Sequence, residues 1–407
     1  MTLPGETKAV TAGKFVLSQD EEGEAVGQFV YGRKYRSRED AVEIDPVELK
    51  LLSGTFKTTR LKGVFGALRD SGPDFWGRQV IQKFTRKTHL SELDYLLESP
   101  EDRAGALAFG LAKSPPAPTR KYNRTIDLGK MQELADALVQ DTLSESEDAI
   151  QVKELIKFCT SMGGARPKAV VEDDYGLWVA KFSRPDDPWN FPRIEHAMLD
   201  LAQRCGIQSA RSKIETIGGK DVLLVQRFDR EKTSLGYLKA RMISGLTVLQ
   251  ADELPSDQSH WSYVILVEEI RRHTSTPKEA ANQLFRRMCF NCLISNTDDH
   301  PRNHAIIAMN KEWKLSPAYD LIPVPEISKE QRFLAMECGD QGRFANRKNL
   351  LSECTRFLIS KEEADSIISE MSKIVDSSWY SVVKSHGVSE KDADSISGAF
   401  LYEGFNY

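Results

Sequence analysis

Apolar residues recur at helical spacing through most of the second half of the chain, which predicts a mainly helical region there. One apolar stripe follows a helix start at 276–279, where Thr276 is a good cap and Pro277 suits the first turn. Its members are Ala281, Leu284, Phe285, Met288 and Cys292. A second stripe follows a capping sequence at 360–363 and comprises Ala364, Ile367, Ile368, Met371 and Val375. Helical spacing also extends over 126–158 and 194–205, and Ser389 begins a last short helix.

Short apolar runs between polar turns are typical of β-strands, and we expect strands at 14–17, 27–31, 170–171, 177–182 and 222–225. Two further runs, 305–309 and 313–315, are separated by Asn310-Lys311 and are typical of a hairpin. The block 63–77 is dense in Gly and aromatic residues. We therefore predict a tightly turned loop there, with Phe75 and Trp76 buried.

A proline-rich stretch separates the first of these patterns from the rest. Pro115, Pro116 and Pro118 favour an extended spacer, which indicates a domain boundary. The predicted division is an N-terminal α/β subdomain at 1–112, a linker at 113–120, a strand-containing lobe at 121–229 and a mainly helical lobe at 230–407.

Composition narrows the class of protein. The chain has 407 residues, a net charge of −5 and a hydrophobic content of 40%, as expected for a globular protein with a sizeable core. The negative charge gives no electrostatic case for direct binding to nucleic acid. No apolar run approaches the ~18 residues of a membrane span, and the N-terminus has no apolar signal core. We therefore expect a cytoplasmic protein with no membrane contact.

The six cysteines are scattered, and most lie in apolar surroundings, which predicts reduced, packed thiols. Cys289 and Cys292 form a C-x-x-C pair inside a predicted helix. No second ligand pair is nearby, so packing is favoured over a metal or redox role.

The polar loop at 296–303 and Asp320 carry the clearest candidate chemistry. A hairpin between them would return the chain close to where it left, so Asp298, Asn303 and Asp320 can converge. This is the layout of a phosphoryl-transfer centre, in which one Asp accepts a hydroxyl proton while an Asn and a second Asp hold Mg²⁺. The alternative is a polar loop whose Asn and Asp side chains only cap turns.

A glycine pair upstream suits the other half of such a centre. In Ser161-Met162-Gly163-Gly164-Ala165-Arg166-Pro167-Lys168 the glycines allow successive N–H groups to point at one phosphate. Lys181 ends the following strand pair, where a kinase lysine grips the α- and β-phosphates. An edge-strand lysine that prevents aggregation is the alternative. Glu195 could pair with Lys181 or lie solvated at a helix start. The switch from apolar to polar residues at 226–230 suits a hinge whose backbone meets an adenine edge.

Taken in order, these motifs resemble the HipA family of bacterial serine/threonine kinase toxins. The resemblance rests on 161–168, 179–181, 226–230, 296–303 and 319–320, and the block 70–77 resembles the family's N-terminal subdomain. It covers the chain from about residue 25 to 400. The implied fold is α+β, bilobal and protein-kinase-like, with 121–229 as the N-lobe and 230–407 as the helical C-lobe.

The resemblance implies a role for each motif. Asp298 would be the catalytic base, and Asn303 and Asp320 the Mg²⁺ ligands. His300 is expected to orient the loop rather than move a proton. The residues implied in ATP binding are Ser161, Met162, Gly163, Gly164, Ala165, Lys168, Lys181, Gln226 and Phe228. Gln226 stands where the family often has Glu. Ser161 matches the serine that these kinases autophosphorylate, an event linked to expulsion of the glycine loop and loss of activity.

The resemblance also implies partners. Family members act with a helix-turn-helix antitoxin, so contact with DNA would be indirect, and aminoacyl-tRNA synthetases are one class of phosphorylated protein. A small-molecule or lipid kinase with the same fold is one alternative, because fold does not fix substrate. A catalytically weak corepressor module is another, although the presence of Lys181, Asp298, Asn303 and Asp320 argues against it.

Overall fold

A computed structural model describes residues 1–85, 89–99, 102–112, 123–124, 128–140, 166–253, 258, 260–325 and 328–406. The chain forms two compact units. The first comprises Met1–Pro185, Gln226–Thr247 and Ile307–Trp313. The second comprises Asp186–Val225, Val248–Ile306 and Lys314–Tyr407. Residues 113–120, the predicted linker, lie outside the described residues, so the division predicted from the sequence stays a prediction.

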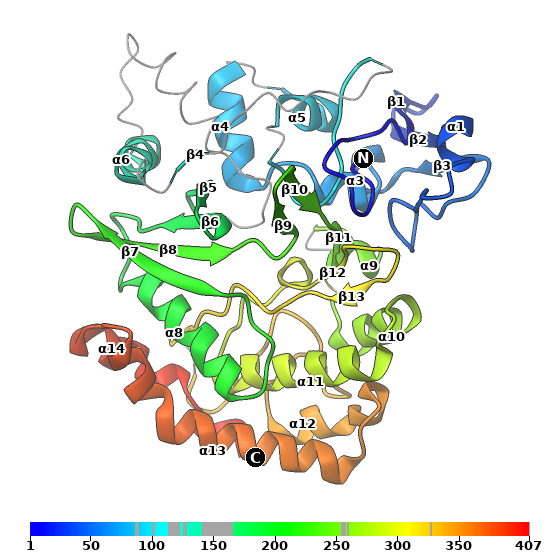
Figure 1. The fold of residues 1–407 in the computed structure, drawn as a ribbon. Helices are drawn as coiled ribbons and strands as arrows, with labels where there is room; N and C mark the ends of the chain where they lie inside the picture. The colour runs from blue at the N-terminus through cyan, green and yellow to red at the C-terminus, as the bar shows by residue number, and fades with distance from the viewer. Residues whose placement is uncertain are drawn as a thin grey trace. The chain divides into compact units, whose positions relative to one another are not determined.

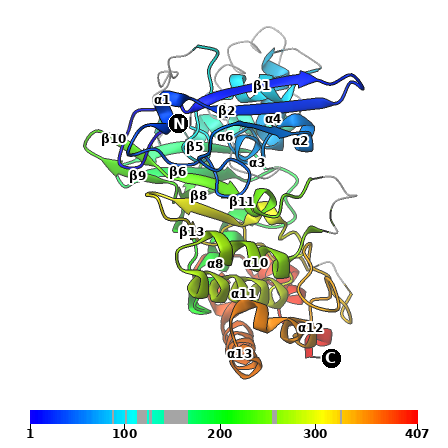
Figure 2. The same cartoon turned by 90° about the vertical axis from the view of Figure 1, so that its right-hand side faces the viewer.

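An antiparallel sheet of order β1-β2-β3 begins the first unit, and Figure 2 shows β1 and β2 as its long hairpin. Its strands are β1 (Gly13–Gln19), β2 (Ala25–Tyr31) and β3 (Thr55–Thr58). The first two confirm the strands predicted there. Short helices alternate with these strands or follow them along the chain, and α2 packs against β2: α1 (Arg33–Arg36), α2 (Arg60–Gly63), α3 (Gly66–Asp70), α4 (Phe75–Thr85) and α5 (Glu92–Glu98).

The predicted loop at 63–77 is therefore partly helical, and one of its two aromatics does not lie where we expected. Trp76 is buried at 4% exposure, but Phe75 is 61% exposed, so the prediction for Phe75 was wrong. The two residues start α4, where neighbouring side chains point about 100° apart. The buried residues Trp76, Val80 and Ile81 share one face of α4, and Phe75 points away from that face.

The residues that follow the glycine pair in the sequence form part of a second group of strands in the first unit. β4 (Asn123–Arg124) pairs in parallel with β5 (Lys168–Asp173), which pairs antiparallel with β6 (Gly176–Phe182). At the β5–β6 turn, Asp173 Oδ1 accepts the N–H groups of Tyr175 and Gly176 at 2.8 and 3.1 Å. Gly176 has φ +137°, which suits a residue without Cβ. This hairpin confirms the predicted strand pair.

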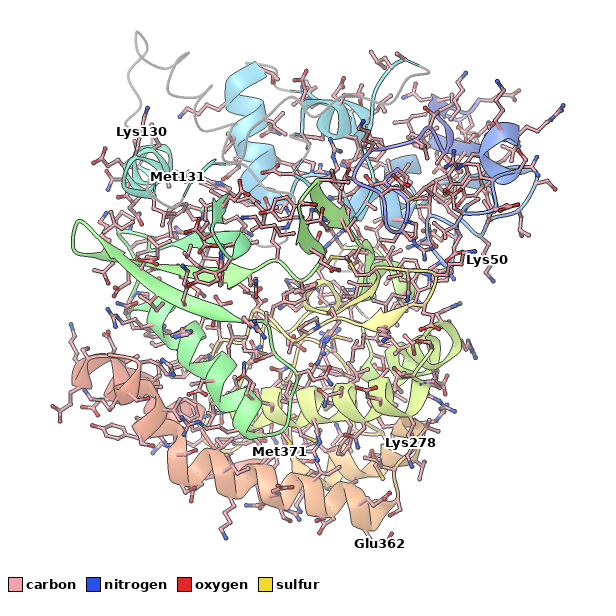
Figure 3. The ribbon with its side chains drawn as sticks, in the orientation of Figure 1. Lys50, Lys130, Met131, Lys278, Glu362 and Met371 are labelled. Carbon is pink, nitrogen blue, oxygen red and sulfur yellow. The ribbon has the colours of Figure 1, made fainter. Side chains whose placement is uncertain are left out.

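Among the described residues of the first unit, the remaining elements are α6 (Leu128–Val139), the hairpin of β9 (Arg230–Thr233) and β10 (Gly236–Lys239), and β11 (Arg241–Ser244). α9 (Gly245–Val248) and β12 (Ala305–Ala308) cross the boundaries between the units. Met131 of α6 is buried, and its neighbour Lys130 is exposed (Figure 3).

The second unit is mainly helical, as predicted. Its principal helices are α8 (Phe191–Arg204), α10 (Tyr263–His273), α11 (Pro277–Leu293), α12 (Arg347–Ser352), α13 (Lys361–Ser385) and α14 (Glu390–Ile396). α11 packs against α10 and α13, and α13 also packs against α8 (Figure 1). Its strands include β7 (Ser212–Ile217), β13 (Lys314–Leu315) and β8 (Lys220–Gln226), whose last residue belongs to the first unit.

Local sequence explains where the two long helices start. Thr276 occupies the N-cap position of α11 and Pro277 is its first residue, but the Thr276 side chain makes no capping hydrogen bond. The predicted stripe behind this start is buried. α13 begins with a capping box in which Ser360 Oγ accepts the Glu363 N–H at 3.2 Å and Glu363 accepts the Ser360 N–H at 2.8 Å. Met371 of its stripe is fully buried, whereas Glu362 is exposed (Figure 3).

Packed, reduced thiols were also predicted from the sequence. The described cysteines are free and buried, which confirms packed thiols there: Cys205, Cys289, Cys292, Cys338 and Cys354. Among the helices in the described ranges, none is long and apolar enough to cross a membrane.

Candidate active site

Hydrogen bonds between two buried amide side chains, Asn291 and Asn296, hold the loop after α11. Asn291, in the last turns of α11, and Asn296 are 0% and 2% exposed. The Asn296 N–H donates to the Asn291 carbonyl at 2.8 Å, and Asn296 Nδ2 donates to Asn291 Oδ1 at 3.1 Å. Asn296 Nδ2 also lies 3.4 Å from the carbonyl oxygen of Asp320. One side chain therefore ties the loop at 296–303 to Asp320, and the predicted convergence has a physical basis within the second unit.

The two adjacent carboxylates of this loop have opposite environments. Asp299 is 1% exposed, and its Oδ2 accepts a hydrogen bond from the Tyr263 hydroxyl and lies 2.8 Å from His304 Nε2. Asp298 is exposed. A base must reach the proton that it removes, so the geometry favours Asp298 for that role and a structural role for Asp299.

The surroundings of Asp298 also shift its protonation. Partial loss of hydration raises the pKa of Asp298 above its ordinary value. His300 lowers that pKa, whereas the negative charges of Asp320 and Asp299 raise it. A higher pKa makes the carboxylate a better proton acceptor, which is a common property of catalytic bases.

Asn303 and Asp320 offer oxygen donors on the two sides of the predicted hairpin. Asn303 lies in the 3-10 helix η3 (Pro301–Asn303), is 7% exposed and donates its Nδ2 to the Asp298 carbonyl at 3.3 Å. This bond uses the amide nitrogen, so the amide oxygen is the atom suited to a cation. Asp320 has φ +61°, an uncommon left-handed conformation that Asp tolerates better than most residues.

These residues fit a Mg²⁺ site of the kind found with nucleotides. Mg²⁺ prefers oxygen ligands and is often held by one or two carboxylates plus water and phosphate oxygens. Such a site needs no cluster of three acidic or His ligands, and the described part of the chain holds none. A divalent cation would also relieve the repulsion between Asp298 and Asp320 that raises the pKa of Asp298.

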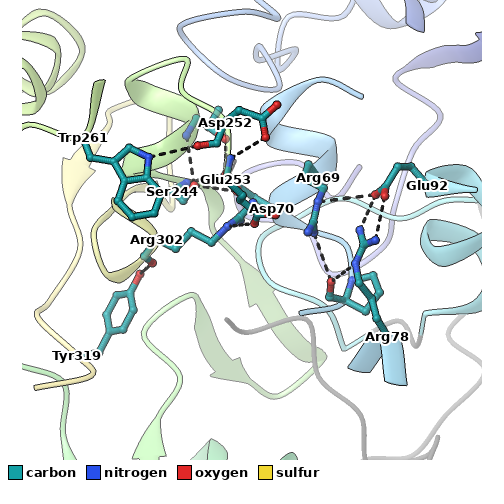
Figure 4. Close-up of polar contacts among 12 residues, drawn as sticks. Arg69, Asp70, Arg78, Glu92, Ser244, Asp252, Glu253, Trp261, Arg302 and Tyr319 are labelled. Atoms are coloured by element: carbon teal, nitrogen blue, oxygen red, sulfur yellow. Dashed lines mark hydrogen bonds and ion pairs between the residues drawn. The ribbon is translucent and has the colours of Figure 1, made fainter. Parts of the chain in front are cut away.

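Hydrogen bonds and one ion pair fix the segments on either side of the site. The Tyr319 hydroxyl donates to the Arg302 carbonyl at 2.8 Å, and Arg302 Nε lies 2.5 Å from Glu253 Oε1 (Figure 4). Arg287, fully buried in α11, donates to the Ser316 carbonyl. The Ser316 N–H in turn donates to the Ala305 carbonyl at 2.9 Å, as expected for the predicted hairpin.

The two lysines predicted to contact phosphate lie directly opposite each other on β5 and β6. Lys168 is 3% exposed, and its Nζ lies 2.7 Å from Asp74 Oδ2. Lys181 is half-buried. Lys168 is thus already neutralised by a buried carboxylate, which favours Lys181 for a direct phosphate contact and an indirect role for Lys168.

The hinge segment, defined here as residues 226–230, meets the opposite end of β6. The Arg227 N–H donates to the Leu177 carbonyl at 2.8 Å. Lys181 lies four residues further along the same face of β6, roughly 13 Å away for an extended strand. That separation is comparable with the length of a nucleotide from base to phosphates. Gln226 and Phe228 are both half-buried in this segment.

Of the other residues predicted for the site, the structure describes some and not others. Ser161, Met162, Gly163, Gly164 and Ala165 lie outside the described residues. His300 is half-buried, with its ring 6.4 Å from that of Trp261. Glu195 is 3% exposed in α8, which disfavours the solvated alternative because a buried Glu is almost always paired.

The model of the HipA-like C-terminal domain family matches residues 160–379, more than half of the chain. The chain belongs to the HipA-like family. The matched range contains every site residue predicted from the sequence, from Ser161 to Asp320.

Known proteins agree with this assignment. A Haemophilus influenzae protein named as a kinase is 24% identical over 201 residues, which cover 44% of this chain and 58% of that protein. A kinase-named protein of Sinorhizobium fredii is 26% identical over 153 residues, covering 36% and 35%. The chain therefore spans about half of the first of these curated relatives and about a third of the second.

A solved structure covers nearly the whole molecule. It is a complex of Shewanella oneidensis HipA, HipB and operator DNA, and its matching chain has a TM-score of 0.67 at 15% identity. The match covers 98% of this chain and 95% of that chain. The predicted α+β, HipA-like kinase fold is thereby confirmed.

Sequence reasoning missed several residues that support the loop of this HipA-like chain. They are Tyr263, Arg287, Asn291 and His304, and all are buried. One signal was available, since Asn291 lies seven residues after Leu284 and therefore on the apolar face of α11. A polar residue in such a stripe needs a buried partner. Asn291 Nδ2 has one in the Tyr263 hydroxyl, at 3.1 Å.

Proposed function

We propose that this HipA-like chain is an ATP- and Mg²⁺-dependent serine/threonine protein kinase of toxin type. The observation that carries the proposal is the arrangement around Asp298, an exposed carboxylate beside Asn303 and Asp320. The buried Asp299 anchors the same loop through its contacts with Tyr263 and His304. Membership of the HipA-like family and two kinase-named relatives support it.

The proposed reaction moves one phosphoryl group. Asp298 takes the proton of a substrate hydroxyl, whose oxygen forms a bond to the γ-phosphorus of ATP. The bond from that phosphorus to the β–γ bridging oxygen breaks, and ADP leaves. Asn303 and Asp320 would hold Mg²⁺, which supplies neutralisation of the phosphate charge. Lys181 would contact the α- and β-phosphates, and the hinge backbone near Gln226 and Phe228 would contact the base.

We propose Ser161 as the site of autophosphorylation. A phosphate there would add about −1.5 to −2 charge at pH 7, directly before the glycine pair. It would compete with ATP phosphates for the backbone N–H groups of residues 162–165 and for Lys168 or Lys181. The modified protein should therefore bind ATP poorly.

Intact mass before and after incubation with Mg²⁺-ATP tests the activity. The wild-type protein should gain one phosphate that maps to Ser161, and the Asp298→Asn protein should gain none. Ser161→Asp should lose ATP affinity, whereas Ser161→Ala should retain it. Phosphate at other residues only would remove the Ser161 switch and leave the kinase proposal. No transfer to the chain or to any protein of a bacterial lysate would remove the kinase proposal.

The partners proposed are a helix-turn-helix antitoxin, which would bring indirect contact with DNA, and a protein substrate such as an aminoacyl-tRNA synthetase. The Shewanella structural neighbour, a complex with HipB and operator DNA, supports the first. Co-purification with the product of an adjacent short helix-turn-helix gene tests it. Labelling of lysate proteins with γ-labelled ATP, followed by mass spectrometry, tests the second, and growth arrest on expression tests toxicity.

A further inference from the structure

Three charged side chains of the hinge segment are buried together within the first unit. The side chains of Arg227 and Asp229 are 0% exposed, and that of Arg230 is 1% exposed. Asp229 Oδ2 lies 2.8 Å from Arg227 Nη2 and 2.6 Å from Arg230 Nη1, and Arg227 Nε donates to Asp229 Oδ1 at 2.9 Å. Burial alone would raise the pKa of Asp229, but the two guanidinium groups hold it well below its usual range.

One carboxylate cannot satisfy two buried guanidinium groups, and the remaining hydrogen-bond partners come from another part of the chain. They belong to residues 102–105, which we call the brace. Arg227 donates to the Asp102 and Arg103 carbonyls at 2.5 and 3.0 Å, and Arg230 donates to the Arg103 carbonyl at 2.6 Å. The Gly105 N–H donates to Asp229 Oδ2 at 2.9 Å.

The brace is itself anchored within residues 1–112. Arg103 is 2% exposed and donates to the Leu96 and Ser99 carbonyls at 3.1 and 3.0 Å, at the end of α5. The Ala106 carbonyl, directly after the brace, accepts the Thr2 N–H at 2.8 Å. The contacts on the hinge segment therefore come from a well-connected part of the N-terminal region rather than from a solvated loop.

These contacts leave the hinge backbone little freedom. The Arg227 N–H is bonded to Leu177 of β6, and the Asp229 carbonyl accepts the Ala240 N–H at 3.0 Å. Arg227 and Asp229 are fixed on the buried side, while Gln226 and Phe228 alternate with them and are only half-buried. The two residues implied in base contact are thus held between two fixed neighbours.

We propose that Asp229 is a positioning residue for the nucleotide base, and that through it the brace fixes the hinge backbone against which the base binds. This inference rests on the proposed ATP binding of the chain. It makes the N-terminal region a working part of the nucleotide site, because a hydrogen bond to a base edge depends on the position of the hinge carbonyl and N–H groups. Asp229 itself does not touch the nucleotide.

A positioning role predicts a loss that is specific to the base. Asp229→Asn should lower the affinity for Mg²⁺-ATP about ten-fold, the effect of losing one well-placed hydrogen bond. Affinity for Mg²⁺ with inorganic tripolyphosphate, which has no base, should stay within about two-fold. Isothermal titration calorimetry or a competition binding assay measures both affinities. Hydrogen exchange of the peptide that covers 226–230 should speed up in the same variant.

Glu92→Gln is the matched control. Glu92 is also a buried carboxylate of the first unit, and it lies 2.5 Å from Arg78 Nη2 and 3.7 Å from Arg69 Nε (Figure 4). Its substitution removes the same kind of charge between two arginines, but no contact with the hinge segment. It should lower stability and leave both affinities and the exchange of 226–230 unchanged.

If Asp229→Asn does not fold, Arg230→Gln carries the test. It removes the bonds of Arg230 to the Arg103 carbonyl and to Asp229 and keeps the Arg227–Asp229 pair. It should show the same base-specific loss. Equal losses for ATP and tripolyphosphate, or unchanged ATP affinity with faster exchange, would overturn the positioning role alone. A wild-type protein that binds no ATP would overturn the proposed function, and this inference with it.

Discussion

Asp299 Oδ2 lies 2.8 Å from His304 Nε2, so that the second of two adjacent carboxylates is used inside the protein while Asp298 is exposed. The Tyr263 hydroxyl donates to the same oxygen, and Asn291 donates to that hydroxyl. The loop is therefore anchored by one aspartate and carries its proposed chemistry on the next. Asp298 and Asp299 are chemically identical residues, and their different burial separates their roles.

The first prediction exploits that separation. Asp298→Asn should lower turnover by about 10²–10⁴-fold with stability and ATP affinity unchanged, because it removes a base and no buried contact. Asp299→Asn should instead lower the free energy of unfolding by about 1–3 kcal/mol, because it disturbs buried hydrogen bonds. Phosphate transfer and thermal melts of both variants measure this. The assignment fails if Asp298→Asn transfers phosphate at a normal rate.

The second prediction concerns Asp320. Asp320→Asn should weaken binding of Mg²⁺-ATP far more than binding of metal-free ATP, since it removes the charge of the proposed Mg²⁺ ligand. Asn tolerates the left-handed backbone at φ +61°, so the loop should keep its conformation. Asp320→Ala should add a backbone cost of about 1–2 kcal/mol to the same loss. An equal loss in both titrations for Asp320→Asn would indicate a structural role.

The third prediction concerns pH and stability in the second unit. Burial, and then the neighbouring His386, lowers the pKa of His196 to about 4 from 6.5. Its Nδ1 lies 2.7 Å from Ser212 Oγ, and its ring is 4.4 Å from that of His386. The unfolded chain binds the proton first, so the contribution of neutral His196 is complete above pH 6.5 and is lost as the pH falls towards 4.

The advantage of the wild-type protein over His196→Gln should therefore shrink by about 1–3 kcal/mol across that range. Urea melts of both proteins at several pH values measure it, and the groups they share cancel in the difference. Parallel stability curves would show that His196 does not titrate differently on folding.

Elements with local signals were predictable from the sequence. The helix starts at Thr276 and Ser360, the stripes behind them and the β5–β6 hairpin follow from residues within a few positions of one another. The prediction for Phe75 failed at the same local level, because burial was assigned by residue type and not by helical position. The burial of a residue in a helix is thus predictable only when its position in the 3.6-residue repeat is taken into account.

Long-range pairs carry no such signal. The bonds from Arg227 to the brace join residues more than a hundred positions apart, and that between Asp299 and Tyr263 joins different elements. Nothing in the local sequence of the hinge segment indicates that its charges are buried, since Arg and Asp are usually exposed. Apart from Asn291, whose position on the apolar face of α11 was a local signal, the residues that hold the candidate site in place could be identified only from the folded chain.

The last prediction separates the two lysines that face each other across β5 and β6. Lys168 and Asp74 form a buried ion pair with side chains 2% and 4% exposed. Lys168→Met would leave the Asp74 charge buried and unpaired, which should cost about 3–5 kcal/mol of stability. The double variant Lys168→Met/Asp74→Asn should recover part of that loss. Lys181→Met should lower affinity for Mg²⁺-ATP with a much smaller effect on stability.

Urea melts and ATP titrations of the wild type, the two single variants Lys168→Met and Asp74→Asn, their double variant and Lys181→Met give two independent readings. A coupling free energy between positions 74 and 168, together with near-normal ATP affinity in the folded double variant, would place Lys168 in support of the strand. If Lys168→Met instead keeps its stability and loses ATP affinity as strongly as Lys181→Met, then Lys168 leaves Asp74 to bind the nucleotide, because a side chain that binds phosphate in the folded protein cannot at the same time neutralise that buried carboxylate.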